Sequence, residues 1–151
     1  MRILLQRIKE ARVDVEGVAG RRAGAGLLAL VGFRRGDEEK LLEPMAAKLA
    51  NLRIFDDGQG RMNLSLLDAG GDLVLVSQFT LYADCRKGRR PGFSDALAPD
   101  LAEPHFERFR RICAGILPTV ITGSFGAEMQ VHLVNDGPVT IMLDSAQLGL
   151  G

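Results

Sequence analysis

The chain has 151 residues, of which 46% are hydrophobic, and this length predicts one domain, residues 1–151, that buries roughly two-thirds of its unfolded surface. Nineteen Lys and Arg residues balance 19 Asp and Glu residues, so no overall field draws the chain to DNA or to an anionic membrane, and any RNA contact must come from a local patch. Two cysteines exclude a disulfide-dense secreted scaffold, and without a signal-peptide core or a membrane-length apolar run we expect a cytoplasmic protein.

The first half of the chain predicts two strands and a helix. Valines alternate with charged residues within residues 3–18, as in a half-buried strand. Residues 27–33 form a continuous apolar run that fits a strand covered on both faces. The Leu and Met spacing over residues 37–52 predicts a helix, in which Pro44 marks either a kink or the true first turn.

The second half predicts more strands than helices. Residues 73–76 read as a buried strand, and residues 82–104 as a long loop that ends where Pro104 begins a helix. Three further strands are expected at residues 119–124, 128–134 and 139–144. This order of elements predicts an α/β fold with helices packed on one side of layered sheets.

Two polar segments interrupt the strand pattern. Ser77-Gln78-Phe79-Thr80 follows a strand, and its simplest interpretation is a loop in which Ser and Thr bond local backbone. Asn135 to Thr140 resembles a hairpin with Asp136-Gly137 as its turn. Pro138 does not suit that hairpin, because it lacks an N–H. A cis Gly-Pro bond would instead leave two backbone carbonyls as fixed acceptors for an ammonium group.

Conventional catalytic and metal motifs are missing from the sequence. Ser77 has no GxSxG pattern, and His105 and His132 are the two histidines available to a triad. His132 alternates with Met129 and Val131, which predicts that it lies on the opposite face of its strand. No His, Cys or carboxylate spacing suits a metal, and no glycine-rich phosphate loop is present.

A basic cluster lies in the predicted loop after residue 82. It comprises Arg86, Lys87, Arg89 and Arg90. Because it begins six residues after Thr80, it would place positive charge beside any site built on residues 77–80. The cluster therefore predicts contacts to RNA phosphates.

The two polar segments carry the signatures SQFT and NxGPVT, and at them the sequence resembles D-aminoacyl-tRNA deacylases of the bacterial and eukaryotic type. Shorter matches cover nearly the whole chain, in order: Gln6-Arg7, residues 13–17, 24–28, 53–55 and 62–64, and Met129 to Val131. The resemblance implies a single domain of strongly curved β-sheets with two main helices on one side. It also implies a hydrolase for chiral proofreading of tRNA, without a metal or organic cofactor.

The resemblance further implies a homodimer with its site at the subunit interface. Gly137-cis-Pro138 of one chain would lie beside Ser77, Gln78, Phe79 and Thr80 of the other. The carbonyl groups of Gly137 and Pro138 would hold the ammonium of a D residue and repel the Cβ of an L residue, whereas glycine would pass. Supporting positions implied by the resemblance are Arg7, Met129, Asn135, Val139 and Thr140.

The same resemblance implies chemistry assisted by the substrate. The 2′-OH of the 3′-terminal adenosine of aminoacyl-tRNA would help to activate water, while N–H groups near Phe79 and Thr80 stabilise the oxyanion. Thr80 as a nucleophile is a rival that we rank lower, because the sequence offers it no evident base. Two other readings stay open: an esterase using Ser77 or Thr80 with His132, and a non-catalytic RNA-binding module built on the basic cluster.

Overall fold

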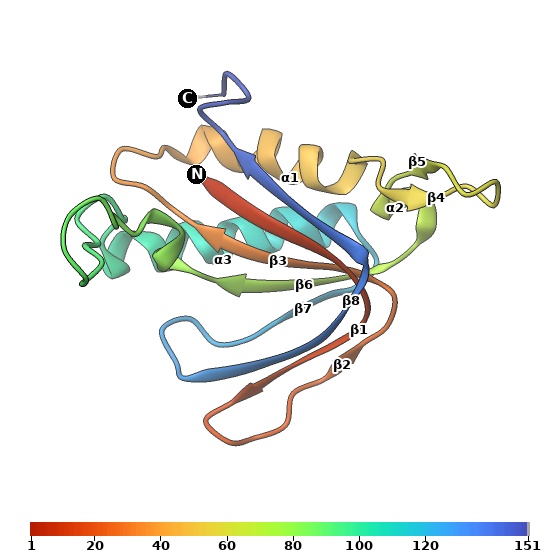
Figure 1. The fold of residues 1–151 in the computed structure, drawn as a ribbon, viewed down its shortest axis with the longest axis horizontal. Helices are drawn as coiled ribbons and strands as arrows, with labels where there is room; N and C mark the ends of the chain where they lie inside the picture. The colour runs from red at the N-terminus through yellow and green to blue at the C-terminus, as the bar shows by residue number, and fades with distance from the viewer. Residues whose placement is uncertain (151) are drawn as a thin grey trace.

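The computed structural model describes residues 1–150, in which a strongly curved six-stranded sheet dominates (Figure 1). Its order is β2-β1-β3-β6-β7, and β8 pairs with the long strand β1. The bounds are β1 Arg2–Val15, β2 Arg22–Ala23, β3 Gly26–Gly32, β6 Asp72–Ser77, β7 Val120–Thr122 and β8 Met129–Asp144. β3, β6 and β7 run parallel to one another, whereas β2, β3 and β8 are antiparallel to β1.

The helices cover one side of this sheet. α1 (Leu42–Asn51) follows a 3-10 turn, η1 (Glu39–Leu41), and packs against α3 (Pro99–Ile116), which runs behind the strands in the view of Figure 1. A short hairpin of β4 (Phe55–Asp56) and β5 (Met62–Leu64), the helix α2 (Leu66–Ala69) and the 3-10 turn η2 (Phe79–Tyr82) complete the described elements. None of the helices in residues 1–150 combines the length and hydropathy that a membrane crossing needs.

Two apolar cores explain the curvature. One lies between the sheet and the helices and includes Leu5, Leu75 and Phe109. The other lies inside the curve, where the far halves of β1 and β8 fold back over β3 and β6, and it includes Val13 and Val74. Burial of apolar surface on both faces of the central strands favours this bent arrangement. The α/β class, the curved sheet and the helices on one side are confirmed.

Two sequence predictions were wrong in this region. No hairpin separates residues 128–134 from 139–144, because β8 continues from Met129 to Asp144 and pairs with β1 both before and after residues 136–139. The helix expected to begin at Pro104 begins at Pro99, which takes the first helical position and leaves Pro104 inside the helix. Pro44 lies in the first turn of α1, in agreement with one of its two readings.

Candidate functional site

The turn after β6 leaves the sheet abruptly. The N–H of Gln78 donates to the Val31 carbonyl at 2.7 Å, and the chain then turns into η2. Phe79 and Thr80 open this 3-10 turn, so their N–H groups have no acceptor within it. Gln78 Nε2 donates to Thr80 Oγ1 at 2.6 Å. The turn thus presents two backbone donors next to an exposed aromatic ring, that of Phe79.

Contacts from the ends of β1 and β8 hold this turn in place. Arg2 Nη1 donates to the Leu81 carbonyl at 2.9 Å, and Arg2 Nε donates to Asp144 Oδ2 at 2.7 Å. The guanidinium also lies over the Tyr82 ring, 4.7 Å from its centroid. The hydrogen bond to Asp144 raises the pKa of Arg2, and burial raises the pKa of the Tyr82 hydroxyl. The position of the turn therefore depends on both ends of the chain.

A cleft of about 750 Å³ opens beside the turn. Phe79 and Phe93 meet there edge to face, with ring centroids 5.0 Å apart. Most of the lining is apolar, and it comes from the ends of β3 and β6, the segment before α3, and the start of β8. The lining residues central to the site are Arg35, Ser77, Gln78, Phe79, Phe93 and Met129. Thr80 is exposed and is not among the residues that line the cleft.

A wide bulge in β8 carries the second polar segment. Gln6 of β1 pairs with Thr140 and Ile8 pairs with Asn135, which leaves residues 136–139 of β8 opposite Arg7 alone. The Gly137–Pro138 peptide bond within this bulge is cis, and both residues are exposed. Irregular pairing of this kind turns backbone groups away from the ladder, so they can face another molecule.

Arg7 braces the bulge from inside the protein. It is buried, and its Nε donates to the Asp136 carbonyl at 3.2 Å and lies 3.3 Å from Asp136 Oδ2. Its Nη1 donates to the Ile54 carbonyl at 2.6 Å. Arg7 thereby links the bulge to the segment that follows α1.

The other side of the bulge is closed by an amide. Asn135 Nδ2 donates to the carbonyls of Arg7 and Val139, each at 3.0 Å. Val139 is buried in the core next to the helices, and Thr140 accepts a hydrogen bond from Gln6 Nε2 at 3.3 Å. The structure thus gathers Arg7, Asn135, Val139 and Thr140 around Gly137–Pro138, whereas Met129 lies in the cleft with Ser77.

Within one chain the two polar segments lie apart. Arg7, which faces the bulge, pairs with Leu27 of β3, and Leu27 pairs with Leu73 of β6. Leu73 lies four residues before Ser77 on that strand. Four residues of strand span about 13 Å. Figure 1 shows the bend of β8 at the opposite end of the sheet from the end of β6. One chain therefore does not bring Gly137–Pro138 to the cleft.

The basic cluster lies in the loop next to the cleft. Asp84 and Gly92 pair across the base of this loop, and Phe93, which follows, lines the cleft. Arg86 is bound to Asp84 by two hydrogen bonds of 2.8 Å, and these hold the pKa of Asp84 at about 2. Lys87, Arg89 and Arg90 are exposed. The loop thus offers positive charge beside the cleft, and Arg86 within it is paired with Asp84.

His132 lies away from the cleft. It is exposed on the opposite face of β8 from Met129 and Val131, as predicted, and its Nε2 lies 3.2 Å from Asp14 Oδ2. The structure therefore places no histidine base beside Ser77 in the way that the esterase reading requires. Within residues 1–150, no group of three or more His, Cys, Asp or Glu side chains is arranged to hold a metal ion.

Arg35 and Phe93 line the cleft without having been singled out from the sequence. Arg35 comes just after β3, far along the chain from residues 77–80, and the sequence contained no signal that the two segments meet. Phe93 lay in a predicted loop, where aromatic residues have no regular spacing. The parallel pairing of β3 with β6 brings Arg35 to the edge where residues 77–80 lie, and the bridge between Arg34 and Ala96 brings the segment of Phe93 there.

The fold is shared with solved structures. A structure titled "Structural Analysis of a probable eukaryotic D-amino acid tRNA deacylase" matches with a TM-score of 0.81 at 22% identity, covering 94% of this chain and 97% of that chain. A second structure, titled "c-Myc DNA Unwinding Element Binding Protein", matches with a TM-score of 0.91 at 38% identity, covering 96% of this chain and 99% of that chain. Both structures therefore share the overall fold of this chain.

The sequence comparisons identify the family. The family model described as D-Tyr-tRNA(Tyr) deacylase matches residues 4–144, and the chain belongs to this family. The D-aminoacyl-tRNA deacylase of Thermosipho africanus is 52% identical over 98% of this chain and 99% of its own length. The D-aminoacyl-tRNA deacylase of Thermomicrobium roseum is 55% identical over 98% of this chain and 96% of its own length.

Proposed function

We propose that this protein is a hydrolase that cleaves the ester bond of D-aminoacyl-tRNA and releases the D-amino acid and tRNA. Family membership over residues 4–144 supports this activity. The observation that carries its finer features is the exposed Gly137–Pro138 bulge, held rigidly by Arg7 and Asn135. Such a bulge can present fixed carbonyl groups that no side-chain rotation removes.

The complete site forms between two subunits of a homodimer. Gly137 and Pro138 are exposed and far from the cleft of their own chain, so a second copy must supply them to it. Their carbonyls face the α-carbon of the substrate, accept hydrogen bonds from the ammonium of a D residue, and repel the Cβ of an L residue. Glycine has no Cβ and passes the same filter. Rejection of L residues therefore needs no recognition of the side chain.

The chemistry depends on backbone and substrate groups. The N–H groups of Phe79 and Thr80 stabilise the oxyanion of the tetrahedral intermediate, a contribution of about 3 kcal/mol per donor. His132 is bound to Asp14 away from the cleft, so the 2′-OH of the terminal ribose helps to activate the attacking water. Ser77 and Gln78 complete the wall around the ester.

The remaining contacts are to RNA. Lys87, Arg89 and Arg90 lie on the exposed loop beside the cleft and contact phosphates of the acceptor end. Because charged tRNA is consumed in the cytoplasm, we place the protein there. The basic loop alone would also suit a non-catalytic RNA-binding module, and the experiment below separates the two.

The test offers matched D-tyrosyl-tRNA and L-tyrosyl-tRNA and follows the release of tyrosine from each. We expect rapid release from the D ester and release from the L ester at the rate without protein. Equal rates on the two esters would contradict the carbonyl filter. Binding without release would favour the RNA-binding module. Hydrolysis of simple esters that is lost in His132→Ala would favour the esterase.

A further inference from the structure

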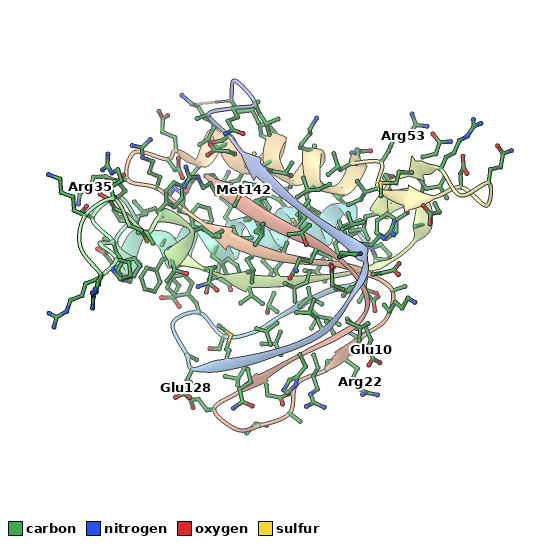
Figure 2. All side chains as sticks on the ribbon, in the orientation of Figure 1. Glu10, Arg22, Arg35, Arg53, Glu128 and Met142 are labelled. Carbon is green, nitrogen blue, oxygen red and sulfur yellow. The ribbon has the colours of Figure 1, made fainter. Side chains whose placement is uncertain are left out.

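Arg35 is the one charged side chain among the described residues that line the cleft. It follows β3, and its N–H donates to the Asp95 carbonyl at 2.9 Å, while its neighbour Arg34 pairs with Ala96. These bonds fix the backbone of residue 35 against the segment before α3. Figure 2 labels Arg35 at the same end of the molecule as the loop that carries the basic cluster.

The guanidinium of Arg35 is available to a ligand. Arg34 Nη2 lies 3.9 Å from Asp95 Oδ2, and Arg86 Nη2 lies 2.8 Å from Asp84 Oδ2, so each of these two arginines has a carboxylate partner. Arg35 is exposed and forms no ion pair with any carboxylate of residues 1–150. A free guanidinium at the mouth of an otherwise uncharged cleft favours an anionic group on whatever binds there.

The chemistry of the substrate indicates which anion this is. The cleft suits an adenosine, because Phe79 and Phe93 offer aromatic surface on which a base can stack. The ester is attached at the 2′ or 3′ oxygen of the terminal ribose, and the only charge nearby on the RNA is the phosphate at its 5′ oxygen. With the ester at residues 77–80, that phosphate must leave the cleft through its mouth.

We propose, building on the proposed function, that Arg35 binds the 5′-phosphate of the terminal adenosine and so selects esters attached to RNA over esters of a free nucleoside. A planar guanidinium can donate two parallel hydrogen bonds to one phosphate. Arg35 would determine specificity, because the 5′-phosphate is present when the adenosine is attached to RNA and absent from a free nucleoside.

The test compares two small substrates that differ in one group, D-tyrosyl adenosine and D-tyrosyl adenosine 5′-phosphate. The readout is the ratio of kcat/KM for the phosphorylated over the unphosphorylated ester. We expect a ratio of about tenfold for the wild type, typical of a charge-assisted contact. In Arg35→Gln the ratio should fall toward one, and Arg35→Lys should restore part of it.

Arg61→Gln is the matched control. Arg61 is exposed in the β4–β5 hairpin at the other end of the molecule, and its removal should leave the wild-type ratio. A wild-type ratio that persists in Arg35→Gln overturns the proposal, even if both rates fall, because equal losses indicate a structural role. Failure of the wild type on both small esters and on D-tyrosyl-tRNA overturns the proposed function and this inference together.

Discussion

Thr80 distinguishes two mechanisms, because its hydroxyl and its N–H would serve different chemistry. We expect Thr80→Ala to keep substantial turnover of D-tyrosyl-tRNA, since its N–H remains. Thr80→Pro removes the N–H, and it also restricts the backbone of Phe79 before it, so the folding control below is part of the test. Its single-turnover rate should fall by about 100- to 1,000-fold.

Thermal unfolding and tRNA binding of both Thr80 variants provide the control for folding. Complete loss of turnover in Thr80→Ala, with the fold and the binding intact, would favour the hydroxyl as nucleophile. Gln78 Nε2 donates to this hydroxyl, and a donated hydrogen bond does not make the oxygen more nucleophilic. The structure thus lends the hydroxyl no activating base among its described contacts.

Gly137 combines backbone and packing constraints at one position. Its φ is +126°, and an added Cβ would lie 2.8 Å from Val139 Cγ2 and 3.2 Å from Arg7 Nη2. Gly137→Ala should therefore shift the bulge, abolish D-tyrosyl-tRNA deacylation and lower the free energy of unfolding by roughly 1–3 kcal/mol. Urea unfolding and the deacylation assay measure the two effects.

Gly58→Ala is the control for backbone strain alone. Its φ is +79°, and nothing lies within 4 Å of the added Cβ. It should cost about 1 kcal/mol of stability and leave deacylation at the wild-type rate. Full turnover in Gly137→Ala would show that the filter does not need the conformation of this bulge.

At the scale of elements, the basic loop is the part of the proposed site where a change of charge should alter the affinity for tRNA. The hydrogen bonds from Arg86 hold the pKa of Asp84 at about 2, below its usual 3.8. Because the pKa is lowered on folding, the pair is intact at neutral pH and is lost only as the pH falls through about 2. At working pH, Asp84 is therefore ionised and competes with phosphate for Arg86.

Asp84→Asn should release Arg86 toward RNA. We expect a lower KM for D-tyrosyl-tRNA and a plot of log KM against log salt concentration that is steeper by about 0.7–0.9. Glu107→Gln is the matched control, since it frees Arg110 of α3 from a 2.9 Å pair in the same way. An unchanged salt slope in Asp84→Asn would place the loop outside the RNA-binding surface.

The elements also show where sequence reasoning holds and where it fails. Strands with continuous or alternating apolar residues, such as β3 and β6, were predicted close to their observed bounds. The hairpin at Asp136-Gly137 failed, because the local turn pattern competes with a bulge that depends on Arg7 of a distant strand. Helix α3 began five residues early because either Pro99 or Pro104 satisfies the first-turn preference.

For the site, the sequence located both polar segments but not their surroundings. Their signatures are local, and so are Asn135, Val139 and Thr140 next to Gly137, whereas Arg7 comes from the distant strand β1. The cleft is assembled by the parallel pairing of β3 with β6 and by the fold-back of β8, which are long-range events. Arg35 and Phe93 could therefore not be assigned from spacing alone.

At the scale of the whole molecule, the sheet holds the Gly137–Pro138 bulge far from the cleft, although the proposed reaction needs both at one site. The bulge that we propose to reject L residues lies in β8 opposite Arg7 of β1, whereas the cleft and its donors lie where β3 and β6 end. Arg7 and the two apolar cores fix this spacing, so a hinge motion within one chain would have to break buried contacts. In the homodimer that we propose, the bulge of each chain would enter the cleft of the other chain.

Mixing two inactive variants tests this arrangement. Gly137→Ala alters the bulge and keeps the turn, whereas Thr80→Pro alters the turn and keeps the bulge. In a heterodimer with shared sites, one site has both defects and the other has none. After equal amounts are unfolded and refolded together, half of the dimers are mixed and each has one working site, so about one quarter of wild-type activity should return.

The same variants refolded separately should stay inactive, and wild type carried through the same procedure sets the full scale. If each site were built from a single chain, every chain in the mixture would still have one defect, and no activity would return. Recovery that also keeps D-tyrosyl-tRNA distinct from L-tyrosyl-tRNA would show that the handedness comes from the bulge of the neighbouring subunit. If the recovered activity hydrolyses both esters equally, the catalytic site is shared between two chains, but the bulge of the neighbouring chain does not reject L residues.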